Sequence, residues 1–285
     1  MSTRRVEELL VARATSDGDG VRLMRVFGGQ DLARFDPFLM LDEFGSESSS
    51  DYIGGFPSHP HRGFETVTYM LDGHMQHRDH MGNVGELRNG DVQWMTAGSG
   101  VIHSEMPQQK EGRMRGFQLW LNLAAKDKMQ PASYKDVPAA AIPVIPREAG
   151  SIKAIAGEVQ GSQGPLHGHI RRPATEPLYL DIVIDKAPYA ETFAVPDGDT
   201  VLVYVYEGSA TVGGTTVGKS RMARLSKQGD VEIRADGPAK LLLISGKPLR
   251  EPIVHYGPFV MNTREEIEQA LTDYRNGTLT QRRAY

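Results

Sequence analysis

Short apolar runs, separated by turn residues, recur along almost the whole chain. They are rich in β-branched and aromatic residues, and glycine or proline lies between them. Such runs are typical of β-strands. The clearest are ETVTYML, DVQWMTA, GFQLWLNL, TVLVYVYEG, DVEIRA and AKLLLISG. The pattern therefore predicts an all-β protein, built as a sandwich or a barrel.

One segment near the C-terminal end has a helical pattern instead. Thr263 and Glu266 have the spacing of a capping box, and Gly277 suits the end of a helix. Between them, apolar residues recur at helical spacing, namely Ile267, Ala270, Leu271 and Tyr274. We expect this apolar stripe to pack on a sheet. A helix that binds a partner protein is the alternative.

The strand pattern repeats once within the chain. VTYMLDG at 67–73 is followed by GDVQWM at 90–95, and LVYVYEG at 202–208 is followed by GDVEIR at 229–234. In each copy a strand ends in an acidic residue and glycine, and Gly-Asp-Val starts a new strand. This order predicts two related β-domains.

Three prolines lie between the two copies, in residues 137–150. Proline cannot donate a hydrogen bond to a central strand, so this segment is expected to be a linker or a sheet edge. The resulting prediction is an N-terminal domain at 1–136, a linker at 137–150, and a C-terminal domain at 151–285 that ends in the helix.

Composition narrows the classes of function. Charged residues make up 24% of the 285 residues and the formal net charge is −4, which argues against a general binder of nucleic acid or membrane surfaces. Cysteine is absent, so disulfides, thiolate catalysis and Fe–S ligation are excluded. A metal would have to be bound through nitrogen and oxygen atoms.

No targeting or membrane segment is evident in the sequence. The N-terminal stretch MSTRRVEELLVARATSDGDG is interrupted by charges and lacks the apolar region of a signal peptide. No later run approaches the roughly 18 apolar residues of a membrane span. These features predict a soluble, cytoplasmic protein.

Two pairs of possible metal ligands occur in separated segments. His59 and His61 are two residues apart, and so are His103 and Glu105. Residues two apart in a strand point to the same face, so each pair can act together. Three imidazoles and one carboxylate suit Fe(II), Mn(II), Ni(II), Cu(II) or Zn(II), and leave open positions on a metal with five or six ligands. A closed tetrahedral zinc site of structural role is the alternative.

The stretch HPHRGFETVTYMLDG…GDVQWMTAGSGVIHSEMP resembles the pirin family, a branch of the cupin superfamily. The resemblance extends to residues 36–45, 117–123 and 251–277. It implies a bicupin, in which two antiparallel β-barrels of jelly-roll type lie face to face and the N-terminal barrel holds one metal ion. It also implies the four metal ligands, which are His59, His61, His103 and Glu105.

Glu65 is a further candidate, because it shares the strand parity of His59 and His61. In the general cupin motif a glutamate at this offset is a ligand, whereas the carboxylate ligand of pirins resembles Glu105. We therefore expect Glu65 to orient an imidazole or to accept a proton in the pocket wall. The alternative is a strand residue paired with Arg62 or Arg78.

The second copy of the pattern lacks these ligands. If the two copies are aligned, the ligand positions and that of Glu65 are taken by Ala194, Pro196, Thr200, Leu242 and Ile244. None of them binds iron well. The C-terminal barrel is therefore predicted to hold no metal and to be filled by side chains.

The remaining histidine groups have simpler explanations. His74, His77 and His80 lie between turn residues, which predicts a hairpin that faces solvent. His167 and His169 form a second His-x-His, but no second pair follows, so a surface loop is expected. A cation site between the barrels is the alternative.

The resemblance implies quercetin 2,3-dioxygenase activity, which opens a flavonol ring and releases carbon monoxide. The metal is expected to be Fe(II), the substrates a flavonol-like molecule and O₂, and Glu105 or Glu65 the proton acceptor. Ser99 stands where many pirins carry arginine.

Two other functions stay open. Pirins are also known as metal-dependent regulatory proteins that bind a transcription factor or a metabolic enzyme. A structural metal beside a vestigial pocket is the third possibility. In each case the resemblance favours a monomer, and the mild net negative charge argues against direct contact with nucleic acid or membrane.

Overall fold

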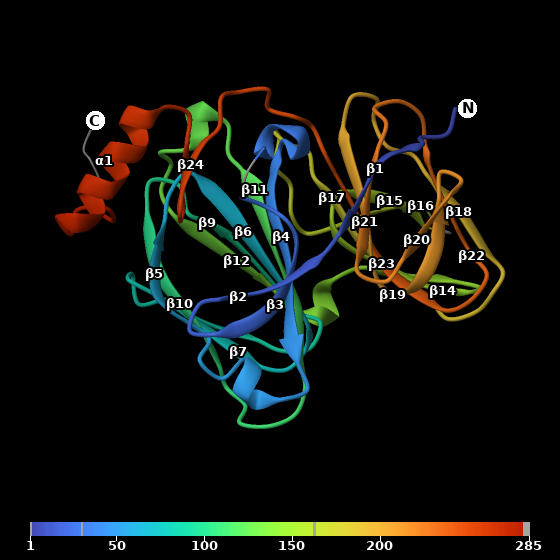
Figure 1. The fold of residues 1–285 in the computed structure, drawn as a ribbon, viewed down its shortest axis with the longest axis horizontal. Helices are drawn as coiled ribbons and strands as arrows, with labels where there is room; N and C mark the ends of the chain where they lie inside the picture. The colour runs from blue at the N-terminus through green and yellow to red at the C-terminus, as the bar shows by residue number, and fades with distance from the viewer. Residues whose placement is uncertain (1, 30, 162–163, 282–285) are drawn as a thin grey trace. The chain divides into compact units, whose positions relative to one another are not determined.

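The computed structural model describes residues 2–29, 31–161 and 164–281. It consists mostly of β-strands, with an α-helix near the C-terminal end (Figure 1), as the sequence pattern predicts. The chain divides into two compact units. Unit A comprises residues 14–139 and 250–285, and unit B comprises residues 1–13 and 140–249.

This division differs from the expected domains at both ends of the chain. Strand β1 (Val6–Val11) pairs with β21 (Arg221–Leu225), so the N-terminal segment belongs to unit B. The C-terminal helix belongs to unit A. Each unit is therefore completed by a segment distant in sequence. The expected boundaries at 1–136 and 151–285 assumed continuous domains, and strand pairing overrides that assumption.

The proline-rich segment between the two copies forms a sheet edge in part. Strand β13 (Val144–Arg147) pairs only with β14 (Gly150–Ala156) and ends the large sheet of unit B. Pro146 is tolerated there, because an edge strand leaves one side of its backbone unpaired. Residues 137–150 were expected to form a linker or a sheet edge. The second half of this segment forms a sheet edge.

Unit A is built from two sheets. The seven-stranded sheet has the order β12-β9-β6-β11-β4-β3-β2, and the four-stranded sheet has the order β5-β10-β7-β8. The strands of the first are β2 (Arg13–Asp17), β3 (Val21–Phe27), β4 (Phe38–Ser46), β6 (Phe64–Asp72), β9 (Val92–Thr96), β11 (Met114–Asn122) and β12 (Ser133–Val137). Those of the second are β5 (Phe56–His61), β7 (Met75–Asp79), β8 (Val84–Leu87) and β10 (Val101–Pro107).

The turn between β5 and β6 depends on a glycine. Gly63 has φ +89°, and a Cβ atom there would lie 2.0 Å from the carbonyl oxygen of Val260. The buried Lys128 side chain donates to the carbonyl oxygens of Gly63 and Val260 at 2.7 and 3.1 Å, and to Asn122 at 2.6 Å. These hydrogen bonds therefore hold the turn in place directly after β5, the strand that carries His59 and His61.

Helix α1 (Arg264–Arg275) begins at the predicted capping box. The Thr263 hydroxyl accepts from the Glu266 amide at 3.2 Å, and the Glu266 carboxylate accepts from the Thr263 amide at 3.0 Å. Ile267 and Ala270 pack against the hairpin of β24 (Val254–Tyr256) and β25 (Phe259–Met261). Tyr274, expected in the buried stripe, is 41% exposed.

Within the described residues, no helix is long and apolar enough to cross a membrane. Short 3-10 helices connect some of the strands. They span Leu32–Phe35, Ser49–Asp51, Ala125–Asp127 and Ala139–Ala141.

Unit B is a ten-stranded sheet with a separate two-stranded ribbon. The main path has the order β1-β21-β19-β23-β17-β14-β13, and the ribbon is β15-β16. Its interior is a continuous aliphatic core. The remaining strands are β15 (Glu158–Gly161), β16 (Gly164–His167), β17 (Leu178–Ile184), β18 (Tyr189–Phe193), β19 (Thr200–Val212), β20 (Thr215–Gly218), β22 (Val231–Ala235) and β23 (Ala239–Gly246).

Strand pairing in unit B repeats that of unit A, but not at the residues expected. In unit A, β6 lies between β9 and β11, and in unit B, β19 lies between β21 and β23. Likewise β10 pairs with β5, and β22 pairs with β18. The strand that matches β9 is therefore β21, so the expected match of residues 229–234 to 90–95 is wrong. Gly-Asp-Val marks the start of a strand but does not identify which strand follows.

The corrected match gives unit B a different set of residues at the histidine positions. Strands β18 and β22 occupy the places of β5 and β10. Their buried side chains are Tyr189, Phe193, Val231, Ile233 and Ala235. None of these offers an imidazole or a carboxylate.

Candidate metal centre

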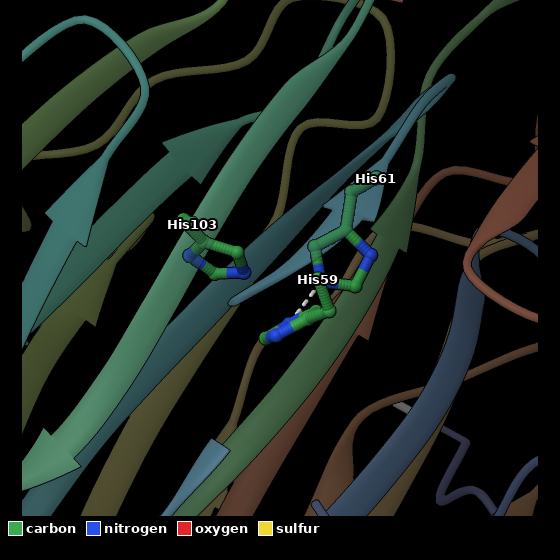
Figure 2. A group of neighbouring side chains, drawn as sticks. All are labelled: His59, His61 and His103. Carbon is green, nitrogen blue, oxygen red and sulfur yellow. Dashed lines mark hydrogen bonds between the residues drawn. The ribbon is translucent and has the colours of Figure 1, made fainter. Parts of the chain in front are cut away.

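Three histidines converge in unit A from two neighbouring strands. His59 and His61 lie on β5 and His103 on β10, where His103 is the register partner of His59. Figure 2 shows the three rings side by side. One ring nitrogen from each lies within 4.8 Å of the others. The parity within each strand therefore brings these three together as the sequence predicts.

A hydrogen bond determines which ring nitrogen of His59 is available to bind a metal ion. The carbonyl oxygen of Pro57 lies 2.8 Å from Nδ1 of His59 and can only accept, so Nδ1 holds the hydrogen atom. In the uncharged ring, Nε2 then presents its lone pair. That atom lies 3.0 Å from Nε2 of His61.

His103 presents a buried nitrogen without a partner. Its Nδ1 atom lies 2.9 Å from Nε2 of His77, whereas its Nε2 atom has no hydrogen-bond partner among the described residues. A buried polar atom without a partner is costly unless a ligand satisfies it. The Nε2 atom of His103 therefore points to a bound group.

The electrostatics of the site keep the imidazoles neutral. Burial lowers the pKa of both His61 and His103 well below the usual value, and the neighbouring histidines lower each pKa further. Neutral imidazole is the form that binds a metal ion. The three side chains thus fit a divalent transition metal in geometry, and burial favours the metal-binding form of His61 and His103.

His77 is a site residue that the sequence analysis placed in solvent. It does lie in a hairpin, formed by β7 and β8, but its side chain is buried and its ring contacts that of His103. The expectation of a solvent-facing histidine holds for His80, which is exposed, but not for His77. The alternation of Met75, His77 and Asp79 along one strand was the signal that could have placed His77 inside.

Glu105 lies beside the histidines, on the strand that carries His103. It is buried, and it accepts hydrogen bonds from the Thr68 hydroxyl at 3.1 Å and from the Gln118 amide at 3.3 and 3.4 Å. A register shift separates it from His103 along the edge with β5. Glu105 is not among the three residues whose ligand atoms cluster within 4.8 Å. Its role as a fourth ligand stays a proposal.

Glu65 faces away from this site. Phe64 contacts the His61 ring and Thr68 bonds Glu105, so the even-numbered residues of β6 face the histidines. Glu65 is buried on the other face, where it accepts from the Thr96 hydroxyl at 2.6 Å. The prediction for Glu65 was wrong because it continued the alternation of His59 and His61 through the turn at Gly63, where that alternation is interrupted.

The alternative partners expected for Glu65 also bond elsewhere. Arg62 donates to Asp273 at 2.8 Å, to the carbonyl oxygen of Ser99 at 2.5 Å and to that of Leu279 at 3.2 Å. Arg78 donates to Gln76. Arg62, which follows His61 directly, thus ties the candidate site to helix α1.

His59 and His61 line a cavity of about 660 Å³ within unit A, and the ring of His103 lies against both of them. Glu105, Gln118 and Trp120 line the same cavity. Most of the wall is apolar, with Leu23, Leu32, Leu39, Met40, Phe44, Phe56 and Val260. A mostly apolar cavity with a few convergent polar groups is the usual form of a small-molecule site.

The other His-x-His pair lies on unit B. His167 and His169 are both exposed, as a surface position requires, and His169 bonds the carbonyl oxygen of Ala141. In the described part of the chain, the histidines of unit A are the group of three or more close ligand residues that could hold an ion.

Comparison with known proteins agrees with this arrangement. The family model described as pirin matches residues 20–121, and that of the pirin C-terminal cupin domain matches residues 179–280. A protein of Pseudomonas aeruginosa named putative quercetin 2,3-dioxygenase is 55% identical, over 97% of this chain and 98% of its own. Pirin of Rattus norvegicus is 39% identical, over 96% of this chain and 93% of its own.

Solved structures show the same fold. A quercetin 2,3-dioxygenase from Acinetobacter baumannii has a TM-score of 0.89 at 34% identity, covering 98% of this chain and 99% of that one. A bacterial pirin from Escherichia coli, in complex with nickel(II), has a TM-score of 0.65 at 20% identity, over 85% of this chain and 98% of that one. Both pirin models and relatives of nearly full length match, so the chain belongs to the pirin family.

Proposed function

We propose that this protein is a metal-dependent dioxygenase that acts on quercetin-like flavonols or a related enediol, with Fe(II) as the metal. The observation that carries the proposal is the convergence of three imidazoles, with the unpartnered Nε2 of His103, beside an apolar cavity of about 660 Å³ that His59 and His61 line. The names of the Pseudomonas and Acinetobacter proteins support the same reaction class.

His59, His61, His103 and Glu105 would hold the ion. Such an ion would supply Lewis acidity toward the enediol and redox chemistry toward O₂. The remaining contributions come from side chains. His77 keeps the ring of His103 oriented through the contact between Nε2 and Nδ1.

Glu105 is the residue suited to accept the substrate proton. Thr68 and Gln118 hold its carboxylate in place, and among the described residues Oε2 receives only the long bond from Gln118. A carboxylate oxygen has two acceptor positions, so Oε2 can take a hydrogen bond, and then the proton, from an enediol hydroxyl. Glu65 is not proposed for this role, because it faces away from the cavity.

The apolar wall has two effects on the reaction. Trp120 lies against the rings of Phe64 and His61, at centroid distances of 4.4 and 5.4 Å, and offers a flat surface to an aromatic substrate. The aliphatic side chains opposite exclude water, which strengthens each electrostatic contact made inside.

The test is a turnover assay with defined metals. Protein freed of metal is loaded with Fe(II), Mn(II), Ni(II), Cu(II) or Zn(II) in turn, and loss of the visible absorbance of quercetin is followed in air. We expect turnover with Fe(II), and we expect His61→Ala to reduce it to the level of metal-free protein. His167→Ala, which removes an exposed histidine of unit B, should retain full turnover.

Two outcomes would contradict the proposal. Turnover that survives His61→Ala would remove the three-histidine site from the mechanism. Absence of turnover with every metal would favour the regulatory alternative over a dioxygenase.

A further inference from the structure

The cavity has a second polar end, formed by charged residues of β2, β3, β4 and the β2–β3 turn. Arg25 and Asp42 are register partners on β3 and β4. Nε and Nη2 of Arg25 bond the two carboxylate oxygens of Asp42 at 3.0 and 2.8 Å, and Nη2 also bonds Asp17 at 3.1 Å. Because Asp42 is buried and accepts from both nitrogens, the guanidinium is held in one orientation.

This end of the cavity retains unused hydrogen-bonding capacity. Nη1 of Arg25 has no partner among the described residues, and neither has the carboxylate of Asp19. Asp17 accepts one bond at each oxygen, from Gly18 and from Arg25, which leaves one acceptor position on each. All three residues, Asp17, Asp19 and Arg25, line the cavity. Hydrogen-bond donors and acceptors therefore lie side by side at this end of the cavity.

Strand register sets the separation between the two ends. Arg25, Asp42, Gln118 and Thr68 form a row across β3, β4, β11 and β6. Gln118 bonds Glu105 at the histidine end. Arg25 is two strands from Gln118, which is a separation of about 10 Å. Asp42 lies between Arg25 and Gln118 in this row, and the neighbouring pair Leu23 and Phe44 also lines the cavity.

The charges of the lining residues restrict what can bind at this end. Asp17, Asp19 and Asp42 are acidic, and Arg25 supplies one positive charge. His255 also lines the cavity, and burial and the charge of Arg25 both lower its pKa. An anionic group placed beside Asp17 and Asp19 would be repelled. A neutral hydroxyl can accept from Nη1 of Arg25 and donate to a carboxylate at the same time.

We propose that Asp17, Asp19 and Arg25 form a subsite for phenolic hydroxyl groups, which selects neutral polyphenols that carry hydroxyls on the ring remote from the enediol. The inference rests on the proposed function, because it assumes that the enediol lies at the histidine end. A vicinal pair of hydroxyls fits best, since one can bond Arg25 and the other a carboxylate.

The test measures binding without turnover. Protein loaded with Zn(II) is titrated, in the absence of O₂, with three flavonols that differ only in the outer ring: quercetin with two hydroxyls, kaempferol with one and galangin with none. Quenching of tryptophan fluorescence reports binding, because Trp120, one of the two tryptophans, lines the cavity. We expect quercetin to bind about tenfold or more tightly than galangin, with kaempferol between them.

Variants then assign the discrimination to the subsite. The double variant Asp17→Ala, Asp19→Ala should lose most of the difference in affinity between quercetin and galangin, because only the bond to Arg25 remains, and its affinity for galangin should match that of the unaltered protein. Asp51→Ala is the matched control, since Asp51 also pairs with an arginine, Arg22, but does not line the cavity. It should keep the full discrimination. Quercetin 3′-sulfate should bind more weakly than galangin.

The outcomes separate this inference from the proposed function. Equal binding of the three flavonols, unchanged discrimination in the double variant, or no flavonol binding at all would overturn the subsite. Discrimination that depends on Asp17 and Asp19, together with no turnover in the Fe(II) assay, would support the subsite and remove the dioxygenase function.

Discussion

The contact between His77 and His103 decides which nitrogen of His103 can face a metal ion. If Nδ1 of His103 donates its hydrogen atom to Nε2 of His77, then Nε2 of His103 carries a lone pair, and that atom is the one without a partner. Burial lowers the pKa of His77 as well, so its ring stays neutral and able to accept. The hydrogen bond therefore prepares His103 for a ligand before any ion arrives.

The variant His77→Ala tests this arrangement. Loss of a side chain that orients a metal ligand typically weakens metal affinity by about 10- to 100-fold. We expect a loss in this range, measured by competition with a chelator of known affinity. His77→Gln, whose amide oxygen can accept from Nδ1 of His103, should recover part of it. His167→Ala, which removes an exposed histidine of unit B, should change nothing, and equal affinity of all variants would contradict the role given to His77.

The turn that follows β5 shows how elements remote in sequence hold the histidine strand. Its Gly63 carbonyl is bonded by Lys128, and its Arg62 is paired with Asp273 of helix α1 at 2.8 Å. Both side chains of the ion pair are almost fully buried, at 4% and 6% exposure. Burial makes this pair costly to break, because removal of one partner leaves a charge without compensation.

Asp273→Ala removes the partner of Arg62. We expect the free energy of unfolding of unit A to fall by about 3–5 kcal/mol, because the guanidinium stays buried without its carboxylate. Asp51→Ala, which breaks the pair with the exposed Arg22 at 3.2 Å, should cost less than about 1 kcal/mol, because the Arg22 charge stays in solvent. Urea unfolding followed by circular dichroism gives both values. A loss for Asp273→Ala no larger than that for Asp51→Ala would show that the pair does not hold the helix to the turn.

The two units of the whole molecule differ in their capacity for metal. Unit A presents the imidazoles on β5 and β10, whereas the matching strands of unit B, β18 and β22, bury Tyr189, Phe193 and aliphatic residues. Unit B therefore repeats the strand pairing of unit A but not its metal-binding side chains. A bound ion should stabilise only the unit that holds it.

Hydrogen exchange with and without Zn(II) tests this difference between the units. At 1,000 times the dissociation constant, an ion that binds only the folded state adds about 4 kcal/mol. We expect slower exchange in peptides that cover β5 and β10 and no change in those that cover β18 and β22. His61→Ala should abolish the effect. Equal slowing in both units would mean that a second ion binds outside the three-histidine group.

Much of the candidate site could be predicted from the sequence, because its decisive signals are local. The strand character of ETVTYML follows from its side chains, and so does the capping box of Thr263 and Glu266. His59 and His61 share a face because they lie in one strand, where the period is two residues. The pattern alone thus determined a β-rich chain with paired histidines and one C-terminal helix.

Only the tertiary structure decided which segments meet. Glu65 faces away from the histidines because a turn at Gly63 resets the strand parity, and His77 faces inward because β7 pairs with β10. The N-terminal strand completes unit B and the C-terminal helix completes unit A through contacts between segments about 200 residues apart. Local sequence encodes the period of each strand, whereas pairing between strands depends on the surface that each buries against the rest of the chain.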